Sequence, residues 1–192
     1  MIADMDGQKD ALRKRIRSAL DEISPAQRIA ASGQLRTRLQ EHPVWKNAKS
    51  VLFFAPLANE ADVWPLLEGA PAAGKDRALP RFDARQQGYV ACRVQNLPGE
   101  IVTGRFGIRE PSDGCPEISL HVPDLILVPG VAFDLSGHRL GRGKGFYDRL
   151  LAKARGVKCG VAFDEQIVKA VAAGTHDIRM DFILTPTRVI KT

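Results

Sequence analysis

The sequence predicts an α/β fold built around a mainly parallel β-sheet. Short apolar runs typical of buried strands recur along the chain, most clearly at 50–55, 124–128 and 157–163. A helical pattern at 146–154 separates the last two of them. Alternating strands and helices favour parallel strands joined by helical crossovers. Ligands in such sheets bind beyond the carboxyl ends of the strands, so we expect the loops that follow the strands to share one rim.

Two amphipathic helices are expected before the first strand. Residues 8–23 carry apolar side chains at intervals of three or four, which predicts one helix. The second is predicted at about 24–41, because it opens with Ser-Pro-Ala-Gln, a capping-box sequence with proline at the first helical position. We expect this second helix to bury Ile29, Leu35 and Leu39.

The other expected elements are mostly short. They are a helix at 62–68, strands at 77–80, 89–94 and 182–184, a mostly loop region at 95–123, and a helix at 164–173. Gly174 is expected to end the last helix, because glycine readily adopts the left-handed conformation at a helix C-terminus.

The composition is that of one ordinary globular domain spanning residues 1–192. Apolar residues make up 44% of the chain and charged residues 26%. No apolar run approaches the roughly 18 residues of a membrane helix, and the first residues lack the apolar core of a signal peptide. The three cysteines show no metal-ligand or Cys-x-x-Cys spacing. We therefore expect a cytoplasmic protein with reduced thiols, no membrane partner and a monomeric state.

The net charge of +6 favours anionic partners. The basic residues are dispersed, and the aromatic residues do not alternate with them as they do in proteins that bind single-stranded nucleic acid. Nucleotides or polyanionic small molecules are therefore the expected ligands, and nucleic acid is not.

The segment 137–148, GHRLGRGKGFYD, is the strongest local signal for a binding site. It holds four glycines and three cationic side chains between an apolar strand and a helix, which suits a phosphate group. It has neither the Walker A nor the Gly-x-Gly-x-x-Gly spacing. A tight solvent-exposed turn would need fewer glycines, so phosphate binding is the favoured interpretation. Arg139, Arg142 and Lys144 are the expected phosphate contacts, and Asp148 is placed to hold a cation beside them.

Acidic residues offer a weaker signal. A nucleotide's Mg²⁺ takes one or two carboxylates together with phosphate oxygens, and Asp148 and Asp181 are candidates. From the residues alone they are equally well explained as the start of a helix and the start of a strand. Glu60 follows a strand, where it is placed either to bind a heterocycle or to cap a helix. The histidines have no catalytic or metal-ligand spacing, and no serine lies in a nucleophile elbow, so phosphoryl chemistry is favoured over nucleophilic hydrolysis.

Ordered motifs along nearly the whole chain resemble the 5-formyltetrahydrofolate cyclo-ligase family. The longest is PDLILVPGVAFDLSGHRLGRGKGFYDRLL at 123–151. The others are Lys9-x-x-x-Arg13, NEADV at 59–63, LPRF at 79–82, GIREP at 107–111, AFDEQIV at 162–168 and HDIRMDFILTP at 176–186. The resemblance implies a three-layer α/β/α fold of the NagB/RpiA/CoA-transferase-like kind. It also implies conversion of 5-formyltetrahydrofolate to 5,10-methenyltetrahydrofolate with ATP and Mg²⁺, through a phosphorylated formyl group, with release of ADP and phosphate.

The resemblance also implies roles for individual residues. The ATP contacts would be Lys9, Arg13, Arg139, Leu140, Gly141, Arg142, Gly143, Lys144, Gly145, Phe146 and Tyr147. The folate contacts would be Leu57, Glu60, Arg142, Gly143, Lys144, Gly145 and Phe146. Arg142 and Lys144 would be catalytic, and Asp148 and Asp181 would bind Mg²⁺. Two rival interpretations are a relative that binds folate or nucleotide without turnover, and a nucleic-acid-associated module of the same fold; the intact cations and both aspartates count against the first.

Overall fold

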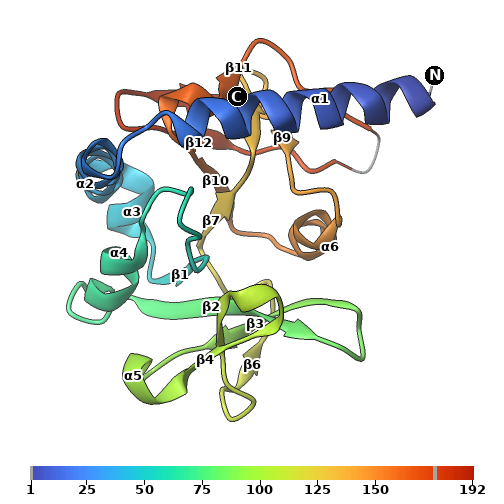
Figure 1. Cartoon of the computed structure of the whole chain (residues 1–192). Helices are drawn as coiled ribbons and strands as arrows, with labels where there is room; N and C mark the ends of the chain where they lie inside the picture. Colours follow the sequence, from blue (N-terminus) through green and yellow to red (C-terminus); the bar gives the residue numbers. More distant parts are fainter. Residues whose placement is uncertain (1, 175–176) are drawn as a thin grey trace.

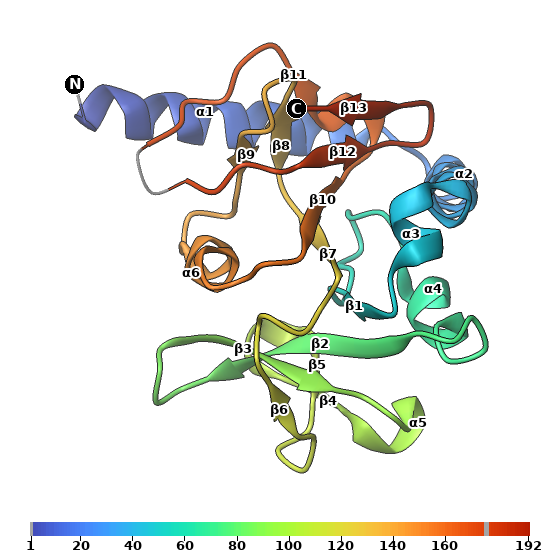
Figure 2. The same ribbon diagram turned by 180° about the vertical axis from the view of Figure 1, so that it is seen from behind.

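The protein is described by a computed structural model that covers residues 2–174 and 177–192. His176, the first residue of the HDIRMDFILTP motif, lies outside the described residues. Figures 1 and 2 show a central sheet with helices on both sides. Within the described ranges, no helix has the length and apolar character needed to cross a membrane.

The helices are mostly short apart from the first two. They are α1 (Ile2–Asp21), α2 (Pro25–Glu41), α3 (Pro43–Asn47), α4 (Trp64–Gly69), α5 (Leu97–Glu100) and α6 (Phe146–Ala152), with 3-10 turns η1 (Arg105–Gly107) and η2 (Asp164–Gln166). The strands are β1 (Ser50–Leu52), β2 (Asp76–Asp83), β3 (Gly88–Arg93), β4 (Ile101–Thr103), β5 (Arg109–Pro111), β6 (Glu117–Ile118), β7 (Leu125–Pro129), β8 (Ala132–Asp134), β9 (Arg139–Leu140), β10 (Val157–Val161), β11 (Ile167–Val168), β12 (Phe182–Leu184) and β13 (Val189–Lys191).

The main sheet has eight strands in the order β13-β12-β10-β7-β1-β2-β3-β6. The five strands from β12 to β2 are parallel, and antiparallel strands complete both edges. A three-stranded sheet, β11-β8-β9, and the β4-β5 hairpin lie outside it. The prediction of a mainly parallel α/β sheet is therefore confirmed.

Alternation along the central strands divides the core between two faces of the sheet. In β7, Leu125 and Leu127 pack with α1 to α4, whereas Ile126 and Val128 pack with the α6 side chains. A strand that is buried on both faces reads as a continuous apolar run, as this one does. The result is three layers, with α2, α3 and α4 on one side and α6 on the other (Figure 1). The predicted three-layer arrangement is confirmed.

The predicted second helix is confirmed, including its capping box. The Ser24 side chain accepts a hydrogen bond from the Gln27 N–H, and the Gln27 side chain accepts one from the Ser24 N–H. The expected burial of Ile29 is wrong, because this side chain is 71% exposed. Arg28 occupies the inward position instead, and its guanidinium donates to the Ile23 and Leu20 carbonyls at the end of α1.

The predicted helix at 164–173 is also wrong. The chain makes only the 3-10 turn η2 there, and then pairs as β11 with β8, with Ile167 opposite Phe133. The buried Gln166 side chain accepts from the Phe163 N–H and donates to the Gly130 and Val131 carbonyls. These bonds to distant backbone groups favour the strand over a continued helix. The predicted loop region at 95–123 likewise contains the β4-β5 hairpin and β6.

Candidate active site

A cavity of about 470 Å³ opens at the carboxyl ends of β1, β2 and β7, beneath α1. Every residue that the family motifs assign to ATP or to folate lines it. These residues are Lys9, Arg13, Leu57, Glu60, Arg139, Leu140, Gly141, Arg142, Gly143, Lys144, Gly145, Phe146 and Tyr147. The fold therefore brings together groups that are more than 100 residues apart in the sequence.

The glycine-rich loop owes its shape to backbone conformations that other residues rarely adopt. Gly143 has φ 98° and Gly145 has φ 64°, both in the left-handed region. A Cβ atom at Gly143 would lie 3.5 Å from the Arg13 guanidinium, an ordinary contact, so the preference for glycine comes from the backbone conformation. In this conformation the loop lines the cavity and presents the exposed Lys144 there.

Two arginines connect this loop to other parts of the chain. From α1, Arg13 Nε donates to the Gly141 carbonyl at 3.0 Å. Arg142 reaches the loop after β1, where it donates to Glu60 Oε1 at 2.9 Å and to Asn59 Oδ1 at 3.2 Å. The other Glu60 oxygen accepts from the Leu57 N–H at 3.0 Å. Glu60 therefore does not cap α4, and both of its oxygens are occupied.

Arg139 lines the cavity but is largely buried. It is 7% exposed, and its guanidinium donates to Asp148 Oδ1 at 2.8 Å and to the Pro129 carbonyl at 3.4 Å. It also lies over the Tyr147 ring, 5.7 Å from the centroid. Arg139 thus holds the start of α6 against the end of β7, with the Asp148 side chain at the cavity wall.

The two aspartates expected to share Mg²⁺ do not lie together. Asp148 lines the cavity, but Asp181 does not. Asp181 immediately precedes β12, and its carboxylate accepts from the Lys158 N–H at 2.7 Å near the start of β10. It therefore lies at the amino ends of the parallel strands, opposite to the edge that carries the cavity. Within the described residues, no cluster of three or more His, Cys, Asp or Glu could hold a metal ion.

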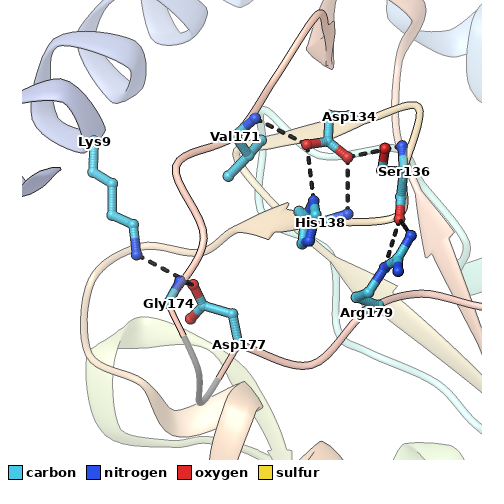
Figure 3. A network of polar contacts seen from close by, with 8 residues as sticks. All are labelled: Lys9, Asp134, Ser136, His138, Val171, Gly174, Asp177 and Arg179. Atoms are coloured by element: carbon cyan, nitrogen blue, oxygen red, sulfur yellow. Dashed lines mark hydrogen bonds and ion pairs between the residues drawn. The ribbon is translucent and has the colours of Figure 1, made fainter.

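Asp177 is a cavity carboxylate to which the sequence interpretation gave no role. It lines the cavity, accepts from the Gly174 N–H at 2.7 Å, and pairs with Lys9 Nζ at 3.3 Å (Figure 3). It belongs to the same motif as Asp181. A residue that directly precedes a parallel strand lies at the edge away from the ligand, so the strand position of Asp181 indicates from the sequence that it lies outside the cavity.

A buried carboxylate fixes the turn that leads into the glycine-rich loop. Asp134 accepts hydrogen bonds from the N–H groups of Ser136, His138 and Val171, and His138 Nδ1 lies 3.1 Å from its Oδ2 (Figure 3). Burial raises the pKa of Asp134, but the hydrogen bonds together lower it by more. The pKa therefore lies below the usual value. The network joins the turn before β9 to the segment that carries Asp177.

Tyr89 and Phe146 bring aromatic rings to the cavity, and Phe82, which does not line it, packs on both. Phe82, Tyr89 and Phe146 make edge-to-face contacts, with ring centroids 5.4 to 6.0 Å apart. Burial is the main cause that raises the pKa of Tyr89, and the nearby Glu110 and Glu60 raise it further. A wall of this kind suits a flat heterocycle, because ring stacking adds to the burial of apolar surface.

The fold and the cavity define an α/β ligand-binding protein suited to anionic substrates. A family model described as the 5-formyltetrahydrofolate cyclo-ligase family matches residues 5–186. The chain therefore belongs to the 5-formyltetrahydrofolate cyclo-ligase family, a family of enzymes, as its ordered motifs predict.

Individual relatives agree with this assignment. The chain is 33% identical over 178 residues to the 5-formyltetrahydrofolate cyclo-ligase of Escherichia coli, covering 91% of this chain and 98% of that one. It is 36% identical over 149 residues to the enzyme of the same name from Mycolicibacterium smegmatis, covering 75% and 77%. The solved structure of Aquifex aeolicus 5,10-methenyltetrahydrofolate synthetase matches with a TM-score of 0.85 and 34% identity, covering 95% of this chain and 92% of that one.

Proposed function

We propose that this protein converts 5-formyltetrahydrofolate to 5,10-methenyltetrahydrofolate, using ATP and releasing ADP and phosphate. The observation that carries the proposal is the cavity itself. It gathers the cationic residues of α1 and the glycine-rich loop together with Leu57 and the rings of Tyr89 and Phe146. The cations suit a polyphosphate, and the apolar and aromatic side chains suit a pteridine ring.

The residues present also fit a nucleotide with its metal ion. Lys9, Arg13 and Lys144 are cations on the cavity surface. Asp148 and Asp177 are carboxylates on the same surface, and one or two carboxylates together with phosphate oxygens are a usual set of protein-bound Mg²⁺ ligands. When bound there, Mg²⁺ would neutralise charge on the phosphates. We propose Asp177 in place of Asp181 as the second carboxylate.

The chemistry explains the need for these side chains. The formyl oxygen attacks the γ-phosphorus of ATP, the bond to the ADP oxygen breaks, and a phosphorylated formyl group forms. N10 of the folate then attacks the formyl carbon, N10 loses its proton, and phosphate leaves as the five-membered ring closes. Arg142 and Lys144 stabilise the negative charge that spreads over the transferred phosphoryl group. N10 belongs to the same folate molecule, so the second step is intramolecular. The protein favours it by holding a folate conformation in which N10 lies close to the formyl carbon.

The test is a mixture of protein, 5-formyltetrahydrofolate, ATP and Mg²⁺. We expect the absorbance of the methenyl product to rise, with one ADP formed per product and no product without ATP. A folded protein that binds the folate yet forms no product would instead be a binding protein. Affinity for RNA or DNA that falls steeply with salt, with no turnover, would favour the nucleic-acid-associated alternative.

Substitutions at the two candidate metal-binding aspartates are expected to have different effects on the Mg²⁺ requirement. We expect Asp177→Asn to raise the Mg²⁺ concentration for half-maximal activity about tenfold or more, or roughly 1.4 kcal/mol of binding free energy. Asp181→Asn is the matched control and should change this value less than twofold, because Asp181 lies outside the cavity. Titrating Mg²⁺ at saturating ATP and folate measures both. A shift in the Asp181 variant alone would restore the original assignment.

A further inference from the structure

Glu110 is a buried carboxyl group on the cavity wall to which the proposed reaction gives no role. It lies on β5, is 4% exposed, and lines the cavity. The structure leaves room for it: a Cβ atom at Gly104, which follows β4 in the same β4-β5 hairpin, would overlap the Glu110 carboxyl group. A glycine is therefore required at 104 for Glu110 to keep this position.

Only one of the two Glu110 oxygens is paired. Oε2 accepts from the Phe82 N–H at 3.2 Å, whereas Oε1 is buried and has no hydrogen-bond partner in the described part of the chain. A buried polar atom without a partner is costly, so it calls for an explanation, and a ligand that donates a hydrogen bond to it is one.

The neighbouring Arg81 and Arg109 do not donate a hydrogen bond to Glu110 Oε1. Arg81 donates to the Ser112 carbonyl at 3.0 Å, and Arg109 stacks on the Trp64 ring at 3.5 Å from its centroid. Burial raises the pKa of Glu110, although the Phe82 N–H and Arg81 act against this rise. The carboxyl group is thus held in a poorly solvated place where a hydrogen bond to Oε1 would be worth more than in water.

The surroundings indicate the kind of donor that Oε1 accepts from. Tyr89 also lines the cavity, and the Glu110 charge is one of the causes that raise its pKa, so the carboxyl group and the aromatic wall are close. Glu60, the other carboxylate on this side, already has both oxygens engaged with Arg142 and the Leu57 N–H. Glu110 Oε1 is therefore the carboxyl oxygen beside the stacking surface that lacks a hydrogen-bond partner among the described residues.

We propose that Glu110 is a substrate-binding residue, and that Oε1 accepts hydrogen bonds from the N–H groups of the amino-substituted pteridine ring packed on the aromatic wall. This inference rests on the proposed function, because it needs a folate in the cavity. A carboxyl oxygen matched to a ring amino group discriminates strongly against rings without that donor, since the buried oxygen is then left unpaired.

The test measures equilibrium binding of 5-formyltetrahydrofolate without ATP. Glu110→Gln should weaken binding about tenfold or more, while the KM for ATP changes less than twofold, because the variant keeps an acceptor for the Phe82 N–H but alters the oxygen that meets the ligand. Glu117→Gln, on exposed β6, is the matched control and should bind folate normally. Unchanged folate binding by Glu110→Gln would overturn the inference.

A folate analogue that lacks the exocyclic 2-amino group supplies a second measurement. The wild-type protein should bind it about tenfold more weakly than 5-formyltetrahydrofolate, and Glu110→Gln should no longer discriminate between the two. Equal affinity of the wild-type protein for both compounds would overturn the inference even if the variant did not fold. If the wild-type protein bound no folate, both the proposed function and this inference would be wrong. If folate turnover were normal and Glu110→Gln had no effect on folate binding, only this inference would be wrong.

Discussion

Replacing Lys144 with alanine is expected to lower kcat by roughly 10²- to 10³-fold without unfolding the protein. Lys144 is exposed at the cavity surface, in the loop shaped by Gly143 and Gly145. Loss of one positioned group that stabilises charge in a transition state typically costs this factor. The measurement is the rate of methenyl product formation at saturating ATP and folate, together with the thermal midpoint of unfolding.

A control variant distinguishes a catalytic role of Lys144 from the general effect of removing one positive charge. Lys153→Ala removes an equal charge at the end of α6, outside this cavity, and should leave kcat within twofold. Retention of more than about a tenth of the wild-type kcat by Lys144→Ala would contradict the phosphate role given to this lysine. A fall in kcat accompanied by a lower midpoint in both variants would point to the fold instead.

Elements with local causes could be predicted from the sequence. The capping box of α2 is formed by Ser24 and Gln27, which are neighbours, so the sequence contains the whole signal. The apolar run of β7 is equally local. The region at 164–173 was different, because the Gln166 bonds to Gly130 and Val131 and the pairing with β8 come from residues more than 30 positions away. A helical pattern cannot reveal such competing partners.

The same distinction applies to the site. The glycine-rich loop is one continuous segment, so the sequence alone marks it as a candidate phosphate-binding segment, whereas Lys9 and Arg13 entered only through the family resemblance. Asp181 was chosen for its position in a motif, but the motif spans two edges of the sheet and only Asp177 reaches the cavity. Glu110 had no visible role, because its importance depends on the space at Gly104 and on the Phe82 N–H.

Replacing Asp134 with alanine is expected to destabilise the protein by roughly 3–5 kcal/mol, the typical loss when one partner of a buried charged network is removed. The change leaves the N–H groups of Ser136, His138 and Val171 without their acceptor, at about 1–3 kcal/mol for each group that stays buried. Urea unfolding measures the loss. Asp113→Ala, at a fully exposed aspartate, is the control and should change stability by less than about 0.5 kcal/mol.

The pH dependence of stability tests the same network without the cavity that the alanine substitution leaves. Because the pKa of Asp134 is lowered in the folded protein, its contribution to stability is complete above its usual value of about 4 and is lost as the pH falls through the lowered value. Asp134→Asn should therefore lose stability near neutral pH and show a weaker further loss on acidification than wild type. Equal acid sensitivity of the two proteins would mean that Asp134 does not hold the turn through its charge. The loop and Asp177 would then need another anchor, since the Val171 contact is the link between them that this carboxylate supplies.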